Sequence, residues 1–327
     1  MNFLTRIPTF LHLLGFIAAQ VFVSQAPSIQ QDYERVKRDG SLTVDLHVTS
    51  DDIYYAEVNF GTPAQLFRVI LDTGSDVNWV ESTNSFADRQ GSHGKYDASV
   101  SSSYTDLCYN FTIIYKIGRV FGYMGEETLQ IGGAILENFQ FGEAINVSFS
   151  IPLKLDGILG LSYDLYDTQG RETLLNAMIS RNLIAKPVFA LDYSRTGSRK
   201  GKIIFGKAAQ ESIPGSLVYE TLAFNEWAIN STAIAVGERL LRFHEQVPVL
   251  MDTGSAYIHA PERLVEYIHS KIPRISLEPN GWYLVDCTAV DTFPHIRIYF
   301  KASSLRLTGR DYVVEVALFV PGYIIIR

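Results

Sequence analysis

The chain has 327 residues, of which 47% are apolar and 19% are charged, and its formal net charge is −7. This length allows one large domain or two medium ones, and the apolar fraction is typical of a globular protein and not of a disordered one. The acidic balance comes without any basic stripe, so we expect no nucleic-acid partner.

The first 26 residues carry one early Arg, an apolar stretch over residues 10–23, and small residues at Ser24 and Ala26. This pattern predicts a cleaved secretory signal peptide over residues 1–26. A membrane anchor and a buried helix are the alternatives, but the apolar stretch is short for a span and polar residues interrupt it. We therefore expect no membrane span after signal removal.

A polar segment without periodicity follows and ends in Lys37-Arg38. In this context the basic pair favours a dibasic processing site and a short propeptide over residues 27–38, as in a zymogen. An ordinary solvated charge pair is the alternative.

Three N-x-[ST] sequons support a secreted, extracellular glycoprotein. The candidate glycosylation sites are Asn110, Asn146 and Asn230. Only two cysteines are present, Cys108 and Cys287, so the chain is not a disulfide scaffold. The spacing of these two cysteines does not show whether they pair.

From residue 44 onward, most of the chain has the pattern of short strands separated by turns. Two apolar-aromatic runs flank Gly61-Thr62-Pro63 and predict a hairpin. Residues 111–133 repeat this pattern, with a bend at 116–119 and a stop at Gly132-Gly133. Further strands are predicted within residues 186–193, 201–206 and 226–237.

Two segments have helical periodicity, residues 171–184 and residues 260–272. The second has Pro261 at a position typical of a first helical turn. The predicted fold class is therefore mostly β with a few short helices.

The tetrapeptide Asp-Thr-Gly-Ser occurs twice, at residues 72–75 and 252–255, and each copy follows an apolar strand. Two copies at corresponding places in two strand-rich halves indicate an internal duplication. A pair of Asx turns closing two hairpins is the structural alternative.

The chemistry of these residues favours a pair of catalytic carboxyls. Glycine allows the tight turn and a close approach of the partner turn, threonine can lock the two turns together, and serine can orient the carboxylate. If the halves pack about a pseudo-twofold axis, the two carboxyls meet and share one proton. One then activates water while the other polarises a carbonyl, so an amide is hydrolysed without a metal or cofactor. The candidate catalytic residues are Asp72 and Asp252, supported by Thr73, Gly74, Ser75, Thr253, Gly254 and Ser255.

With these and other landmarks in order, residues 54–314 resemble the pepsin family of aspartic endopeptidases. Trp79 is similar to the tryptophan whose indole N–H supports the flap tyrosine, and Tyr115 is similar to that tyrosine. Gly118 lies at the family's glycine spacing in the flap. The sequence LDGILGL at 155–161 resembles the apolar-apolar-Gly element beneath the first catalytic loop, and EWAI at 226–229 resembles the strand after the lobe crossover.

The resemblance implies a bilobal, double-ψ β-barrel pseudo-dimer, with an N-terminal lobe over residues 39–190 and a C-terminal lobe over residues 191–327. It implies polypeptide substrates held by Tyr115, Gly118 and Trp79, inhibition by statine-type peptides, and a monomeric enzyme with neither cofactor nor metal. Within the family, Lys37-Arg38 and YLVDC at 283–287 are similar to the secreted fungal branch of candidapepsins and yapsins.

Three departures from the family pattern are expected to matter. The propeptide is short, and the flap bend has Tyr-Lys-Ile-Gly where the family favours Tyr-Gly-[small]-Gly. After residue 314 the family continues with a second apolar-apolar-Gly segment and two closing strands, which brace the second aspartate and hold the disulfide partner that the resemblance implies for Cys287. We therefore expect an incomplete C-terminal lobe and a less firmly held Asp252.

Two other hypotheses stay open at this point. The first is a catalytically impaired homologue that binds peptides or inhibitors, and the second is a truncated product that does not fold. The seven histidines show no HExxH spacing, and no G-x-S-x-G elbow indicates a Ser-His-Asp triad, although the sequence alone leaves such a triad open.

Overall fold

The computed structural model describes residues 11–13, 36, 39–49, 53–86, 94–115, 118–148, 155–162, 171–193, 200–212, 217–224, 226–273, 276–277, 283–315 and 323–326. It has two compact units. The N-terminal unit comprises residues 15–217, and the C-terminal unit comprises residues 1–14 together with residues 218–327. The sequence pattern places the lobe boundary earlier, between residues 190 and 191.

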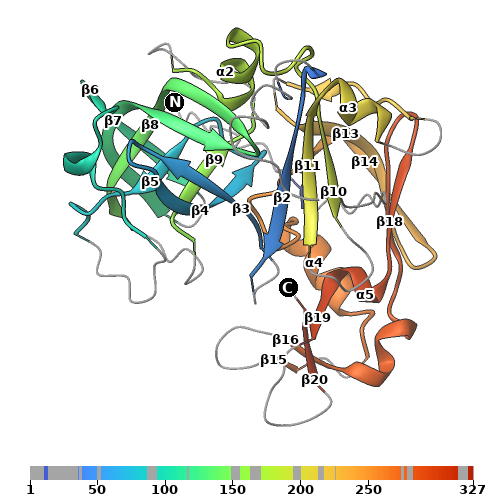
Figure 1. The fold of residues 1–327 in the computed structure, drawn as a ribbon. Coiled ribbons are helices and arrows are strands. Elements are labelled where there is room, and N and C mark those ends of the chain that lie inside the picture. Colours follow the sequence, from blue (N-terminus) through green and yellow to red (C-terminus); the bar gives the residue numbers. More distant parts are fainter. Residues whose placement is uncertain are drawn as a thin grey trace, which may run out of the picture. The chain divides into compact units, whose positions relative to one another are not determined.

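A ten-stranded sheet forms the N-terminal unit, in the order β10-β11-β2-β3-β4-β9-β5-β8-β7-β6 (Figure 1). Most neighbours are antiparallel, but β4–β9 and β5–β8 are parallel pairs. The strands are β2 (Ser41–Val48), β3 (Tyr54–Phe60), β4 (Gln65–Asp72), β5 (Trp79–Glu81), β6 (Thr105–Tyr115), β7 (Gly118–Ile131), β8 (Ala134–Val147), β9 (Gly157–Gly160), β10 (Phe189–Tyr193) and β11 (Lys200–Gly206).

The predicted hairpins of this unit are confirmed. β3 pairs with β4 around Gly61-Thr62-Pro63, and β6 pairs with β7. Of the predicted bend at 116–119, residues 116 and 117 lie outside the described residues. Gly132 and Gly133 have φ of 55° and 85°, a region open to glycine at little cost, and they turn the chain from β7 into β8.

The core of the N-terminal unit is aromatic and aliphatic. Its side chains include Phe60, Phe67, Phe139, Phe141 and Phe205, each at most 1% exposed. Helix α2 (Leu174–Ser180) adds one apolar face to this core, because the predicted 3.6-residue period places its leucines and Met178 on the same side. The Thr173 hydroxyl caps this helix by accepting the backbone N–H of Asn176 at 3.3 Å.

The C-terminal unit has two smaller sheets. One has the order β1-β14-β13-β17-β18, with β12 beside β13, and the other has the order β15-β16-β20-β19. Their strands are β1 (Leu11–Leu13), β12 (Leu222–Ala223), β13 (Ala228–Val236), β14 (Arg239–Met251), β15 (Ser276–Leu277), β16 (Tyr283–Asp286), β17 (Ile296–Tyr299), β18 (Ser304–Leu307), β19 (Val313–Glu315) and β20 (Tyr323–Ile326). β1 lies within the segment predicted as a signal peptide, and it pairs with β14 in parallel.

Short helices complete both units. The predicted helix within residues 260–272 is confirmed as α4 (Glu262–His269), and Pro261 immediately precedes it as the N-cap residue. The others are α3 (Lys207–Glu211), α5 (Gly309–Tyr312), and the 3₁₀ turns η1 (Ala98–Val100) and η2 (Cys287–Thr292). The predicted class, mostly β with a few short helices, is confirmed.

Candidate active site

The first Asp-Thr-Gly-Ser turn follows directly from a buried strand. β4 ends at Asp72, whose side chain is only 5% exposed. The backbone N–H of Gly74 donates to Oδ1 of Asp72 at 2.8 Å, and the Ser75 hydroxyl donates to Oδ2 at 2.6 Å. Both carboxylate oxygens are therefore held in place by donors from the same turn.

Strand β9 braces this turn from the side. It pairs in parallel with β4, so that Gly160 lies opposite Asp72. The backbone N–H of Leu161 then donates to the Asp72 carbonyl at 2.7 Å, and that of Ser162 donates to the Ser75 carbonyl at 3.0 Å. The LDGILGL segment therefore lies against the first Asp-Thr-Gly-Ser turn, as the family resemblance implies.

Asn78 is a supporting residue that the sequence reasoning missed. Its side chain is 3% exposed, and its amide oxygen accepts the backbone N–H of Gly160 at 3.1 Å. It thereby ties the end of β9 to the segment after the turn. The available signal was a polar residue placed between Val77 and Trp79 in an otherwise apolar run.

Trp79 and Tyr115 form a hydrogen bond across the N-terminal unit. The indole N–H of Trp79 donates to the Tyr115 hydroxyl at 2.9 Å, and the indole is fully buried. Burial of the hydroxyl raises the pKa of Tyr115 well above its ordinary value, and the negative charge of Asp72 raises it further. Tyr115 therefore remains protonated and able to donate a hydrogen bond near Asp72. Gly118 begins β7, on the other arm of the same hairpin.

The second Asp-Thr-Gly-Ser turn has the same backbone pattern at the end of β14. The N–H of Gly254 donates to Oδ1 of Asp252 at 3.0 Å, as Gly74 does in the first turn. The serine differs, because the Ser255 hydroxyl donates to the carbonyl of Tyr257 at 3.0 Å rather than to the aspartate. Asp252 and Thr253 are half-buried, whereas Asp72 and Thr73 are buried. The second turn is thus the more open of the two.

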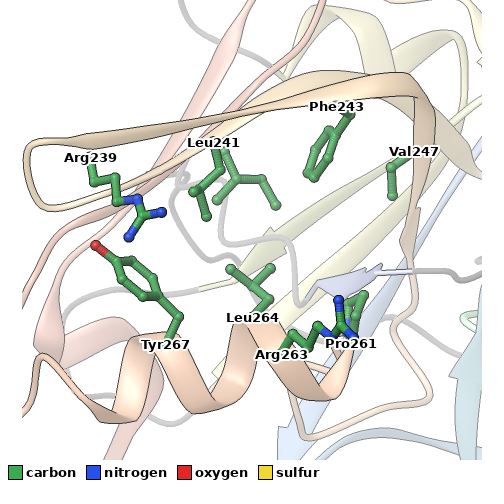
Figure 2. Close-up of a pocket in the computed structure, with 9 residues that line it drawn as sticks. Arg239, Leu241, Phe243, Val247, Pro261, Arg263, Leu264 and Tyr267 are labelled. Atoms are coloured by element: carbon green, nitrogen blue, oxygen red, sulfur yellow. The ribbon is translucent and has the colours of Figure 1, made fainter.

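A separate pocket of about 520 Å³ lies in the C-terminal unit between β14 and α4 (Figure 2). Figure 2 shows Leu241 and Phe243 above Leu264 of the helix, with the Arg239 guanidinium beside the Tyr267 ring, 4.8 Å from its centre. The full lining is Ile234, Arg239, Leu241, Phe243, Val247, Pro261, Arg263, Leu264 and Tyr267. None of these is a candidate catalytic residue, and the mainly apolar lining offers no acid–base pair.

The remaining predicted features are the three glycosylation sequons, the cysteines and the dibasic processing site. Asn110 and Asn146 are exposed on β6 and β8, and Asn230 is half-buried on β13. The Cys108 thiol is free and exposed. The predicted processing site, Lys37-Arg38, lies outside the described residues.

Over the ranges that the structure describes, no three His, Cys, Asp or Glu side chains gather as a metal site would require. Nor does any helix in those ranges combine the length and apolarity needed to cross a bilayer.

Comparison with known proteins shows the family to which the chain belongs. A family model described as eukaryotic aspartyl protease matches residues 53–318. Among curated relatives, renin of Rattus norvegicus is 31% identical over 270 residues, covering 80% of this chain and 66% of the renin. Cathepsin D of Clupea harengus is 31% identical over 273 residues, covering 81% and 68%. The vacuolar aspartic protease of Candida albicans is 31% identical over 271 residues, covering 81% and 64%. The chain thus spans about two thirds of the length of these relatives.

Proposed function

Because the chain belongs to the eukaryotic aspartyl protease family, we propose that it is an endopeptidase that hydrolyses peptide bonds at acid pH with Asp72 and Asp252 as its catalytic pair. One observation carries the proposal, namely the shared construction of the two turns. Asp72 is the last residue of β4 and Asp252 directly follows β14, and each accepts the backbone N–H of the glycine two residues later, at 2.8 Å and 3.0 Å. Such a turn holds a carboxylate rigidly without help from a metal.

The proposed chemistry follows from placing two such carboxyls together. Two carboxyls in contact do not both ionise readily, so they share one proton, as aspartic-protease dyads do. The ionised member takes a proton from water, which attacks the peptide carbonyl, while the protonated member donates to the carbonyl oxygen. The tetrahedral intermediate then collapses, and the proton that the first carboxyl took from water goes to the leaving amine.

The substrate proposed for this site is an extended polypeptide. A peptide in a β-lined cleft is held by main-chain hydrogen bonds, with side chains in alternate pockets. The β6–β7 hairpin would serve as the flap, and its protonated Tyr115, fixed by Trp79, would contact the peptide. A statine-type peptide, which mimics the tetrahedral intermediate, should therefore inhibit the enzyme.

The test is acid proteolysis by the full chain produced in a eukaryotic host. A denatured protein is digested between about pH 3 and pH 7, with and without a statine inhibitor. Asp72→Asn and Asp252→Asn should each abolish turnover and leave secretion intact, whereas Asp45→Asn, an exposed aspartate on β2, should behave as wild type. Substantial acid proteolysis in either dyad variant would rule out the pair.

The same experiment decides the alternative of a catalytically impaired homologue. The more open second turn, in which Ser255 bonds to Tyr257 and not to Asp252, is the feature that favours this alternative. Folded wild-type protein that binds the statine peptide without cutting any substrate would establish a peptide- or inhibitor-binding protein instead.

We further propose that the protein is a secreted, glycosylated monomer of the candidapepsin- and yapsin-like fungal branch. The signal-like residues 1–26, the exposed sequons at Asn110 and Asn146, Lys37-Arg38 and YLVDC at 283–287 support this narrower assignment. Protein recovered from the medium should run as a monomer, lose mass on deglycosylation and begin at Asp39. An N-terminus elsewhere would exclude processing at the basic pair.

A further inference from the structure

The pocket between β14 and α4 has an apolar interior of a size that suits a small molecule. Its volume of about 520 Å³ lies within the range of about 300–1,000 Å³ that is typical of ligand sites. Leu241 and Phe243 line it from β14, and Leu264 lines it from α4 (Figure 2). These three apolar side chains are only half-buried, so they keep surface that a ligand would cover.

The period of each element explains which side chains line the pocket. Successive residues of a strand point to opposite faces, so Arg239, Leu241 and Phe243 share the pocket face of β14. Arg242 lies between two of them in the sequence, is exposed and does not line the pocket. On α4, Leu264 and Tyr267 are three residues apart and therefore share one face of the helix.

One end of the pocket carries two positive charges. The Arg239 guanidinium lies 4.8 Å from the centre of the Tyr267 ring, and the Lys271 ammonium lies 5.1 Å from the same centre. Figure 2 shows Arg239 and Tyr267 at this end, with Pro261 and Arg263 at the other end. The apolar side chains lie between the two ends, so the pocket joins a cationic end to an apolar interior.

The charge of this end is not neutralised by a neighbouring carboxylate. Among the ion pairs that link described residues, none includes Arg239 or Lys271. The acidic residues of α4, Glu262 and Glu266, are exposed and do not line the pocket. A planar guanidinium matches a carboxylate through two parallel hydrogen bonds, so the charge and shape of this end are complementary to a carboxylate head group.

We propose that this pocket binds a long-chain carboxylate of the fatty-acid type. Its head group pairs with Arg239 and Lys271, and its alkyl chain covers Leu241, Phe243 and Leu264. No candidate catalytic residue lines the pocket, so the proposal does not rest on the proposed protease activity. The experiment measures binding alone, and its outcome is therefore independent of whether the chain cleaves peptides.

The probe is laurate, titrated into the full chain by calorimetry at neutral pH and below its critical micelle concentration. Octanoate has the same head group and a shorter chain, and dodecyltrimethylammonium has a chain of similar length and the opposite charge. Each buried methylene tightens binding by about fourfold, so octanoate should bind more weakly than laurate by roughly tenfold or more. The ammonium compound should show no saturable binding, because its head group would meet two cations.

Arg239→Gln tests the head-group contact, and Arg242→Gln is the matched control on the opposite face of the same strand. Both variants remove one positive charge from the C-terminal unit, but only the first removes it from the pocket. Loss of a hydrogen bond to a charged group should weaken laurate binding to Arg239→Gln by about fivefold or more. Arg242→Gln should bind laurate as the wild-type chain does.

Hydrogen exchange locates the bound laurate. Exchange should slow at the α4 amides of residues 264–267. Equal laurate affinity in the two variants, equally tight binding of the ammonium compound, or slowing confined to the N-terminal unit would overturn the proposal. Dimerisation in sedimentation experiments, with the α4 amides protected by the dimer and no laurate bound, would show that a second copy fills the pocket and would also overturn it.

The amides of residues 233–236, in the β13–β17 pair, report whether the C-terminal unit of Arg239→Gln is folded. If they lose protection in that variant, the three probes are compared on the wild-type chain alone. Saturable binding of laurate that slows exchange in α4, with weaker octanoate and no ammonium binding, then supports the pocket as a fatty-acid site. Absence of that pattern refutes it.

Discussion

Replacing Gly160 by alanine tests whether β9 holds the first Asp-Thr-Gly-Ser turn, which we propose to be catalytic, in place. The added Cβ atom would lie 2.6 Å from the Ser75 carbonyl oxygen and from the Asp76 carbonyl carbon, and 2.8 Å from the Val77 nitrogen. All three are backbone atoms, so no side-chain rotation relieves the overlap. Because non-bonded carbon contacts are optimal at about 3.5–4.0 Å, the turn or the strand has to move by roughly 1 Å.

Two magnitudes follow from this displacement. Overpacking of a close-packed interior costs about 1–3 kcal/mol, so the free energy of unfolding of the N-terminal unit should fall by about 2 kcal/mol. Ser75 lies in the displaced turn and its hydroxyl holds the Asp72 carboxylate, so the carboxylate should move as well. A misplacement of about 1 Å at a catalytic group costs roughly 100-fold in rate, and we expect kcat to fall by that order.

The free energy is measured by urea unfolding with hydrogen exchange in β4 and β9, which reports on the N-terminal unit alone. Peptide hydrolysis at acid pH gives kcat. Gly94→Ala is the matched control, because its Cβ atom would lie 3.3 Å from its nearest neighbour, the Leu66 carbonyl oxygen. A Gly160→Ala chain with the stability and kcat of the Gly94→Ala control would refute the proposed bracing of Asp72 by β9.

Three further predictions concern other parts of the molecule. The fully buried carboxylate of Asp156 accepts the backbone N–H groups of Arg68 and Gly94, at 2.8 and 2.9 Å. Asp156→Asn should therefore lower the free energy of unfolding, measured in urea, by about 2–3 kcal/mol. A change below about 0.5 kcal/mol would contradict this prediction. Trp79→Phe removes the hydrogen-bond donor to the Tyr115 hydroxyl and should lower kcat/KM about fivefold. Adding Tyr115→Phe to this variant should lower kcat/KM little further, because the hydrogen bond between the two side chains is already lost. Fully additive losses would show that the two residues act independently. Burial lowers the pKa of His269 below its ordinary 6.5, so the stability that the neutral ring contributes is present above that pH and is lost as the pH falls. His269→Gln should therefore raise the melting temperature relative to wild type more at about pH 4.5 than at about pH 7.5, and a pH-independent difference would argue against this effect.

Much of the fold could be predicted from the sequence because the relevant signals are local. The hairpin around Gly61-Thr62-Pro63 and the faces of α2 and α4 follow from turn residues and periodicity within a few positions. The predicted strands within 186–193 and 201–206 did not reveal that β11 pairs with β2, which begins at Ser41. That pairing joins segments about 160 residues apart, and no local pattern encodes such a partner.

The sequence by itself determined which residues form the two turns, because an Asp-Thr-Gly-Ser turn is closed by bonds that span two or three residues. Gly74 bonds to Asp72, and Gly254 bonds to Asp252, in the same way. Only the tertiary structure decided how each turn is supported. Asp72 is buried because β9, more than 80 residues further along the chain, runs beside it as far as Gly160, whereas Asp252 at the end of β14 is only half-buried. Identical tetrapeptides therefore differ in burial and in the bonding of their serines, because both depend on strands brought alongside from distant parts of the chain.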